Sequence, residues 1–146
     1  MIDELIRNNR SCRRFHQDRP VALDTLKAMV DLARLSASSA NQQPLKYILS
    51  TNAETNRLIF NCLGWAGYLK DWRGPEEGEQ PSAYIVILGD TGITGSFDCD
   101  HGIAAQSILL GARDRGLGGC MIGSINRKKL RDALQIRRLK TISTKE

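Results

Sequence analysis

Apolar positions along the first half of the chain predict two helices and a strand. Over residues 2–8 the aliphatic side chains lie three and four positions apart, which is typical of a short helix. Pro20 predicts the start of a second helix, in which apolar residues over 23–33 recur at the same spacing and form one face toward the core. This face consists of Leu23, Leu26, Met29, Val30 and Ala33. Residues 36–44 are small and polar and end in a proline, so they predict a loop before a strand at 45–50.

The second half of the pattern places a buried strand between helices. Residues 83–89 (AYIVILG) are apolar on both faces, as expected for a central strand covered by helices. Helices are predicted over 51–62, which opens with a Thr-x-x-Glu capping box, over 99–115, which is followed by a glycine cap, and over 126–135. The segment 118–124 (GGCMIGS) predicts a short strand. Helices alternating with few strands indicate an α+β or α/β sandwich around one modest sheet.

Composition indicates one ordinary globular domain. The chain has 146 residues, of which 41% are hydrophobic and 25% are charged, and this balance is typical of a soluble protein. No apolar stretch is long enough to span a membrane, and no export signal is visible. The four cysteines form no CxxC pair and predict no disulfide framework, which favours a reduced, cytoplasmic protein. They are Cys12, Cys62, Cys99 and Cys120.

The net charge of +5 is concentrated at the end of the chain. Residues 127–146 contain eight basic and two acidic side chains, so the preceding part is nearly neutral. We therefore divide the chain into one domain over 1–136 and a basic C-terminal tail over 137–146. The tail has no aromatic residues between its basic ones, so a solvated helix end is the favoured interpretation and nucleic-acid binding is not expected.

Three polar or glycine-rich segments are candidates for ligand binding. The stretch 10–15 (RSCRRF) is either a solvated turn or an anion site, because guanidinium groups match phosphate oxygens. The loop 38–44 (SSANQQP) offers neutral hydrogen-bonding side chains suited to a polyol or a heteroaromatic edge. The segment 116–124 (GLGGCMIGS) is either a helix cap with a tight turn or a place where backbone approaches a flat ligand. Phosphate, polyol and flat ring together are the parts of flavin mononucleotide (FMN).

The order of these motifs resembles that of a known family. The run of NRSCRRF, SSANQQP, AYIVILGD and DHGIAAQSILLGARDRGLGGCMIGS is similar to the nitroreductase family of FMN-dependent oxidoreductases, over residues 2–136. The resemblance implies an α+β fold, a three-layer α/β/α sandwich, which forms an intertwined homodimer with FMN at the subunit interface. Relatives usually continue past the last predicted helix with another strand, so we expect a shortened or altered C-terminus here.

The resemblance also implies roles for particular residues. Arg10 and Ser11 would hold the phosphate and ribityl chain, and Arg13 would lie at the pyrimidine edge of the flavin. The backbone at Ile122 and Gly123 would face the flavin near N5. Four side chains would come from the other subunit, namely Ser38, Ser39, Asn41 and Gln43. Arg14 matches no fixed role in the family and is expected to be exposed.

The activity implied is hydride transfer through the flavin. Hydride from NADH or NADPH would enter at N5 and pass to a nitroaromatic, a quinone or another electron-poor acceptor in a ping-pong mechanism. No catalytic residue of the protein is required, and Arg13 would stabilise negative charge on the reduced flavin. The alternative is a catalytically impaired member that serves as a flavin- or polyanion-binding module. Reductive dehalogenation and flavin fragmentation, found in other branches, have no distinguishing feature in this sequence.

Two further features have more than one interpretation. Trp65, Tyr68 and Trp72 lie at intervals of three and four residues and could pack into the core or cover the flavin. Cys99 and His101 could suggest a metal site, but their spacing is not that of a known zinc motif, and we predict no metal.

Overall fold

A three-stranded antiparallel sheet forms the middle of the molecule. The computed structural model describes residues 1–136 and 140–141, with strands β1 (Leu45–Ser50), β2 (Tyr84–Gly89) and β3 (Lys140–Thr141) in the order β1-β2-β3. Strand β1 pairs with β2 along its whole length, from Leu45 opposite Gly89 to Ser50 opposite Tyr84. The predicted central strand is therefore confirmed as β2, which has a neighbour on each side.

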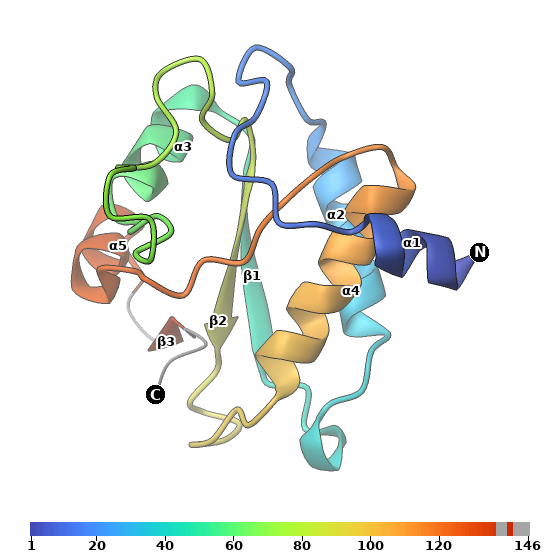
Figure 1. Cartoon of the computed structure of the whole chain (residues 1–146). Coiled ribbons are helices and arrows are strands. Elements are labelled where there is room, and N and C mark those ends of the chain that lie inside the picture. Colours follow the sequence, from blue (N-terminus) through green and yellow to red (C-terminus); the bar gives the residue numbers. More distant parts are fainter. Residues whose placement is uncertain (137–139, 142–146) are drawn as a thin grey trace.

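Helices cover both faces of this sheet (Figure 1). Helices α2 (Leu23–Arg34) and α4 (Asp100–Asp114) pack on one face, and α3 (Ala53–Phe60) and α5 (Arg127–Ala133) lie on the other. The first helix, α1 (Ile2–Asn8), packs against α4 at the edge of the first layer. The arrangement is a three-layer sandwich, and the predicted fold class is confirmed.

The alternation of side chains along β2 connects the two layers. Ile85 and Ile87 pack toward α2 and α4, whereas Val86 and Leu88 belong to the cluster under α3 and α5. Because successive side chains of a strand point to opposite faces, an all-apolar strand is required where both faces are covered. Strand β1 alternates in the same way: Tyr47 and Leu49 pack toward α2 and α4, and Ile48 packs toward α3 and α5.

Several predicted boundaries were wrong. Helix α3 is capped by Asn52, whose side chain accepts from the Thr55 amide at 2.8 Å, so the predicted capping box at Thr51 does not form the cap. Helix α2 begins at Leu23 rather than directly after Pro20. The segment 118–124 is not a strand of the sheet: Gly119 forms an isolated bridge with Ser11, and Ile125, just after the segment, forms another with Leu63. Its glycines lack the side chains that stabilise a strand by packing.

The basic tail lies mostly beyond the part of the chain that the structure describes. Of residues 137–146, only the backbone of Lys140–Thr141 is described, and it pairs with Leu88 and Gly89 of β2. Within the described residues, no helix is both long enough and apolar enough to cross a membrane.

Candidate functional site

The arginine stretch lies directly beside the glycine-rich segment. Ser11 and Gly119 form a parallel bridge, and the Cys12 amide donates a hydrogen bond to the Gly119 carbonyl at 2.9 Å. In Figure 1 the N-terminal chain leaves α1 and crosses the segment that leads from α4 to α5. The tertiary structure thus joins two of the three segments that the sequence proposed for the ligand.

The three arginines of this stretch have different surroundings. Arg14 is exposed, as expected, and its Nε lies 3.6 Å from a Glu79 carboxylate oxygen. Arg13 is half-buried, and its guanidinium carbon lies 5.8 Å from the centre of the Tyr68 ring. Within residues 1–136 neither Arg10 nor Arg13 forms a salt bridge with an acid. These two cations are therefore the ones available to an anionic ligand.

Two half-buried titratable groups, Cys120 and Tyr84, interact with each other, and Cys120 also interacts with Arg13. Burial raises the pKa of Cys120, while the Arg13 charge lowers it and Cys12 raises it. Burial, with a smaller effect of Cys120, also raises the pKa of Tyr84. The Tyr84 hydroxyl is buried and has no hydrogen-bond partner within the described residues. Both groups are therefore neutral near pH 7, and Arg13 is the charged group close to Cys120.

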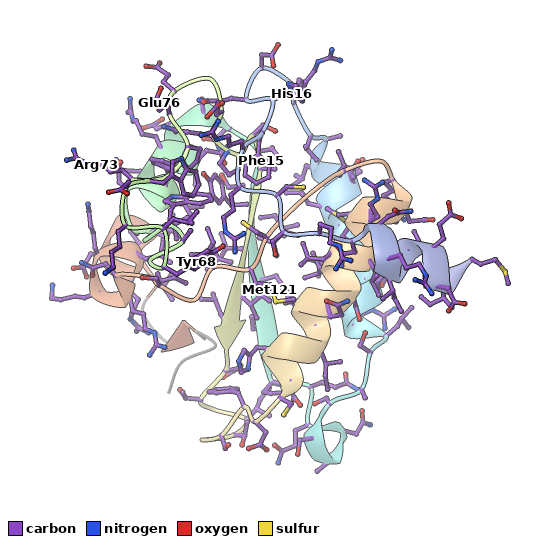
Figure 2. All side chains as sticks on the ribbon, viewed as in Figure 1. Phe15, His16, Tyr68, Arg73, Glu76 and Met121 are labelled. Atoms are coloured by element: carbon purple, nitrogen blue, oxygen red, sulfur yellow. The ribbon has the colours of Figure 1, made fainter. Side chains whose placement is uncertain are left out.

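Aromatic residues 65–72 divide between core and surface. The Trp65 side chain is buried and packs on Phe60, with ring centres 5.8 Å apart, and edge-on against Trp72 at 6.4 Å. Tyr68 is instead 70% exposed and lies over Arg13. In Figure 2 Phe15, Tyr68 and Met121 appear on the face that the arginine stretch crosses. The core interpretation therefore holds for Trp65, against which the half-buried Trp72 packs, and Tyr68 is the aromatic residue beside Arg13.

The polar loop is held in place by a buried carboxylate. Asp100, at the start of α4, is 5% exposed and accepts hydrogen bonds from Ser38 Oγ and from the Ser39 amide, both at 2.8 Å. Ser38 Oγ in turn accepts from the Gln43 amide at 2.9 Å. The hydroxyl of Ser38 is thus occupied within the chain and shapes the loop. The sequence presented Asp100 only as an acid at a helix start, because its partners lie about sixty residues earlier.

The tip of this loop is exposed and locally strained. Ala40, Asn41 and Gln43 have φ angles of 49°, 53° and 51°, in the left-handed region that residues other than glycine rarely adopt. Gln43 Nε2 donates to Asn41 Oδ1 at 2.8 Å, so the two side chains predicted to contact a ligand are paired with each other. Strain of this kind persists only where surrounding contacts impose it, and it is concentrated at functional sites.

The third segment does not join the other two within one chain. The loop 38–44 lies at the end of the sheet where β1 begins, and the arginine stretch crosses the molecule toward the opposite end (Figure 1). Ile122 and Gly123, by contrast, are half-buried and follow the bridged Gly119 within a few residues. One copy of the chain therefore brings together residues 10–13 with 118–123 and leaves 38–43 separate.

Comparison with known proteins fits this architecture. The chain matches the Nitroreductase family over residues 6–70 and 79–143. It belongs to the nitroreductase family. Both the predicted family and the predicted fold are confirmed by this match.

Solved structures of similar proteins have the same fold as this chain. A nitroreductase family protein from Clostridium novyi NT superposes with a TM-score of 0.79 at 25% identity, over 98% of this chain and 81% of that protein. A protein of a Desulfovibrio desulfuricans subspecies, solved in complex with FMN, superposes with a TM-score of 0.79 at 21% identity, over 97% of this chain and 81% of its own.

The curated relative extends well beyond this chain. A Methanothermobacter thermautotrophicus protein, named provisionally as an NADH dehydrogenase/NAD(P)H nitroreductase, is 31% identical over 122 residues. That alignment covers 82% of this chain but 59% of the relative.

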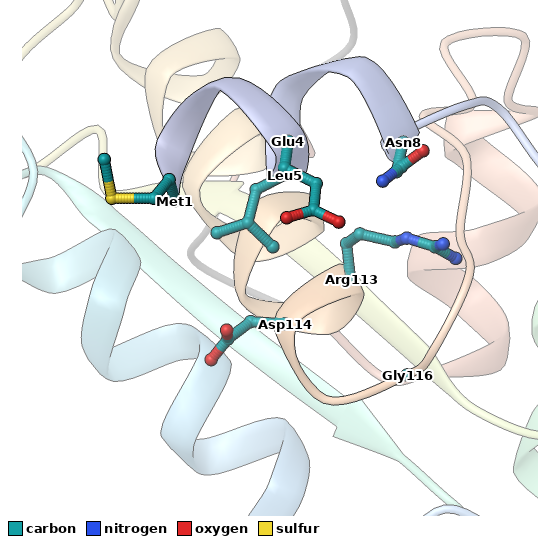
Figure 3. Close-up of a pocket in the computed structure, with 7 residues that line it drawn as sticks. All are labelled: Met1, Glu4, Leu5, Asn8, Arg113, Asp114 and Gly116. Carbon is teal, nitrogen blue, oxygen red and sulfur yellow. The ribbon is translucent and has the colours of Figure 1, made fainter.

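A hollow on this nitroreductase-family chain lies close in sequence to the candidate site, because Asn8 and Gly116 are among its lining residues. It has a volume of about 430 Å³ and opens between α1 and the end of α4, where Glu4, Leu5 and Arg113 line it (Figure 3). Its lining mixes acidic, basic and apolar side chains, so it shows no preference for one ligand class. Within the described residues, no three potential metal ligands among His, Cys, Asp and Glu come together.

Proposed function

We propose that this chain is a flavin-dependent oxidoreductase that binds FMN and uses NADH or NADPH to reduce a small electron-poor acceptor. The observation that carries the proposal is the bridge between Ser11 and Gly119, which sets the arginine stretch beside a glycine-rich backbone; Arg10 and Arg13 in this stretch form no salt bridge within the described residues. Family membership supports the reaction class, and relatives of the same fold from Exiguobacterium sibiricum and Desulfovibrio desulfuricans were solved in complex with FMN.

The residues present fit such a cofactor. A phosphate needs positive charge and donors, and Arg10 and Arg13 have guanidinium groups without an acidic partner among the described residues, beside the Ser11 hydroxyl. Burial keeps Cys120 and Tyr84 neutral, so no negative charge of theirs opposes an anion there. Arg10 and Ser11 would hold the phosphate, and the backbone at Ile122 and Gly123 would border the ring.

The proposed site requires a second copy of the chain. Ser39, Asn41 and Gln43 are exposed on a loop that one chain does not bring to the arginine stretch. A homodimer in which this loop reaches the arginines of its partner would complete the set of donors. Asp100 would then act by holding the loop in the conformation that its partner meets.

The chemistry would belong to the cofactor, and the protein would position and polarise it. Bound FMN would supply hydride acceptance and donation at N5. Arg13 would stabilise negative charge next to it, an effect of about 4 kcal/mol for a charge pair near a protein surface. Tyr68 would hold the Arg13 side chain from its exposed side and border the space for nicotinamide or acceptor. Donor and acceptor would occupy the same space in turn, which gives ping-pong kinetics.

The test is an absorption spectrum of the protein after incubation with FMN and removal of free flavin. The expected result is a bound flavin spectrum that bleaches on anaerobic addition of NADH or NADPH and returns on addition of a quinone or a nitroaromatic. Parallel double-reciprocal lines would support the ping-pong order. A protein that retains no flavin would contradict the proposal, and one that retains flavin without bleaching would instead support the binding-module alternative.

A further inference from the structure

Two cysteines lie one residue beyond the bridged pair of the candidate flavin site. Ser11 and Gly119 are bridged in parallel, and one residue farther along each segment are Cys12 and Cys120. In a parallel pair, residues in register lie on the same face, with backbones about 4.8 Å apart. Disulfides join Cα atoms about 4.4–6.8 Å apart, so this register is compatible with a covalent bond.

The surroundings leave the Cys12 thiol room to turn. Its Sγ donates to the Arg10 carbonyl at 3.5 Å and lies over Gly118, where an added Cβ would come within 2.7 Å of the sulfur. A side chain at position 118 would therefore fill the space beside the thiol. Both cysteines are half-buried, which admits a small oxidant. The effect of Cys12 on the Cys120 pKa is a second sign that the two thiols are close.

We propose that Cys12 and Cys120 form a reversible disulfide when the protein meets a peroxide. The Cys12 thiolate attacks one oxygen of hydrogen peroxide and becomes a sulfenic acid as hydroxide leaves. The Cys120 thiol then gives up its proton as its sulfur attacks the Cys12 sulfur, and the sulfenic oxygen leaves as hydroxide. The two thiol protons and the two hydroxides give two waters, so two thiols are oxidised and one peroxide is reduced.

The bond would fasten the arginine stretch to the glycine-rich segment. Arg13 directly follows Cys12, and Ile122 and Gly123 follow Cys120, so the cross-link would join the two segments from which the proposed cofactor contacts come. Oxidation would thus fix the relative position of these contacts. The disulfide is inferred from the pairing of the two segments and the closeness of the two thiols, and it does not depend on the proposed function.

The experiment counts thiols rather than activity. The full chain is treated with hydrogen peroxide, its remaining thiols are alkylated, and the tryptic peptides are analysed without reduction. The expected result is a linked pair of peptides spanning 11–13 and 116–127, with loss of alkylation at Cys12 and Cys120 and recovery of both after dithiothreitol. The Cys99→Ser variant is the matched control, because Cys99 is exposed and should be dispensable for the link.

Two variants make the result decisive. Cys12→Ser should leave Cys120 alkylated after peroxide, and Cys120→Ser should leave a trapped sulfenic acid or higher oxide at Cys12 instead of a cross-link. Alkylation of both cysteines in the oxidised parent chain would overturn the proposal. So would a cross-link that involves Cys99 and is lost in Cys99→Ser, since the bond would then not join the two bridged segments.

Discussion

Neighbouring arginines at the start of this chain have different roles because tertiary contacts treat them differently. Arg14 meets the carboxylate of Glu79 at the surface, whereas Arg13 turns inward under Tyr68 and beside Cys120. The sequence indicated a cluster of positive charge and assigned Arg14 to solvent through the family resemblance. The contact between Arg13 and Tyr68 could not be predicted, because the two side chains meet only after the chain has folded.

At this scale we predict that Arg13→Ala weakens FMN binding about 10- to 100-fold, since charge-assisted hydrogen bonds are worth about 1.5–3 kcal/mol. Arg14→Ala is the control, because its charge is already paired with Glu79 at the surface, where ion pairs contribute about 0–1 kcal/mol. Fluorescence titration of FMN measures both. Equal affinities of the two variants would remove Arg13 from the site.

At the scale of elements, the loop between α2 and β1 depends on a helix far along the chain. Asp100 at the start of α4 holds two positions of the loop by hydrogen bonds, and three residues near the tip of the same loop have left-handed φ angles. The sequence predicted the loop and the helix separately. It gave no sign of their contact, because hydrogen bonds between distant segments leave no periodic pattern.

We predict that Asp100→Asn lowers the free energy of unfolding by about 2–3 kcal/mol, as expected for losing hydrogen bonds to a buried charged group. Asp98→Asn is the matched control, because Asp98 is exposed and, within the described residues, accepts a side-chain hydrogen bond only from Ser96 Oγ in the same turn. Urea unfolding followed by circular dichroism gives both values. If the loop is part of the flavin site, Asp100→Asn should also weaken FMN binding. Stability equal to that of Asp98→Asn would show that the loop does not need the carboxylate.

On the scale of the whole molecule, burial in two layers sets how stability depends on pH. Burial raises the pKa of Cys62 and Cys120 and of Tyr47 and Tyr84. At pH values below 9.0, the ordinary pKa of a cysteine thiol, these groups are mostly protonated in both the folded and the unfolded chain. Above it the unfolded chain releases protons that the folded chain retains, so stability falls as pH rises.

We therefore expect that these groups leave the free energy of unfolding unchanged between about pH 7 and 8 and lower it from about pH 9 upward. The total loss from each group is about 1.4 kcal/mol for each unit by which its pKa in the folded chain exceeds that in the unfolded chain. Tyr84→Phe should reduce this alkaline loss at little cost near neutral pH, because its hydroxyl has no partner in the described part of the chain. Urea midpoints between pH 7 and 10.5 provide the measurement. An alkaline loss of the same size in Tyr84→Phe would contradict the assignment.

The sequence by itself determined the layers. Strand β2 is apolar on both faces, and α2 has apolar residues three and four positions apart; these local patterns are typical of a strand covered on both sides and of a helix packed on one side. The order of the motifs identified the family. It did not determine the segment 118–124, where glycine removes the packing that defines a strand. The structure alone set Ser11 against Gly119, Cys12 close to Cys120 and Asp100 against the loop. Such contacts join residues far apart in the chain, and they form only when the layers fix where each segment lies.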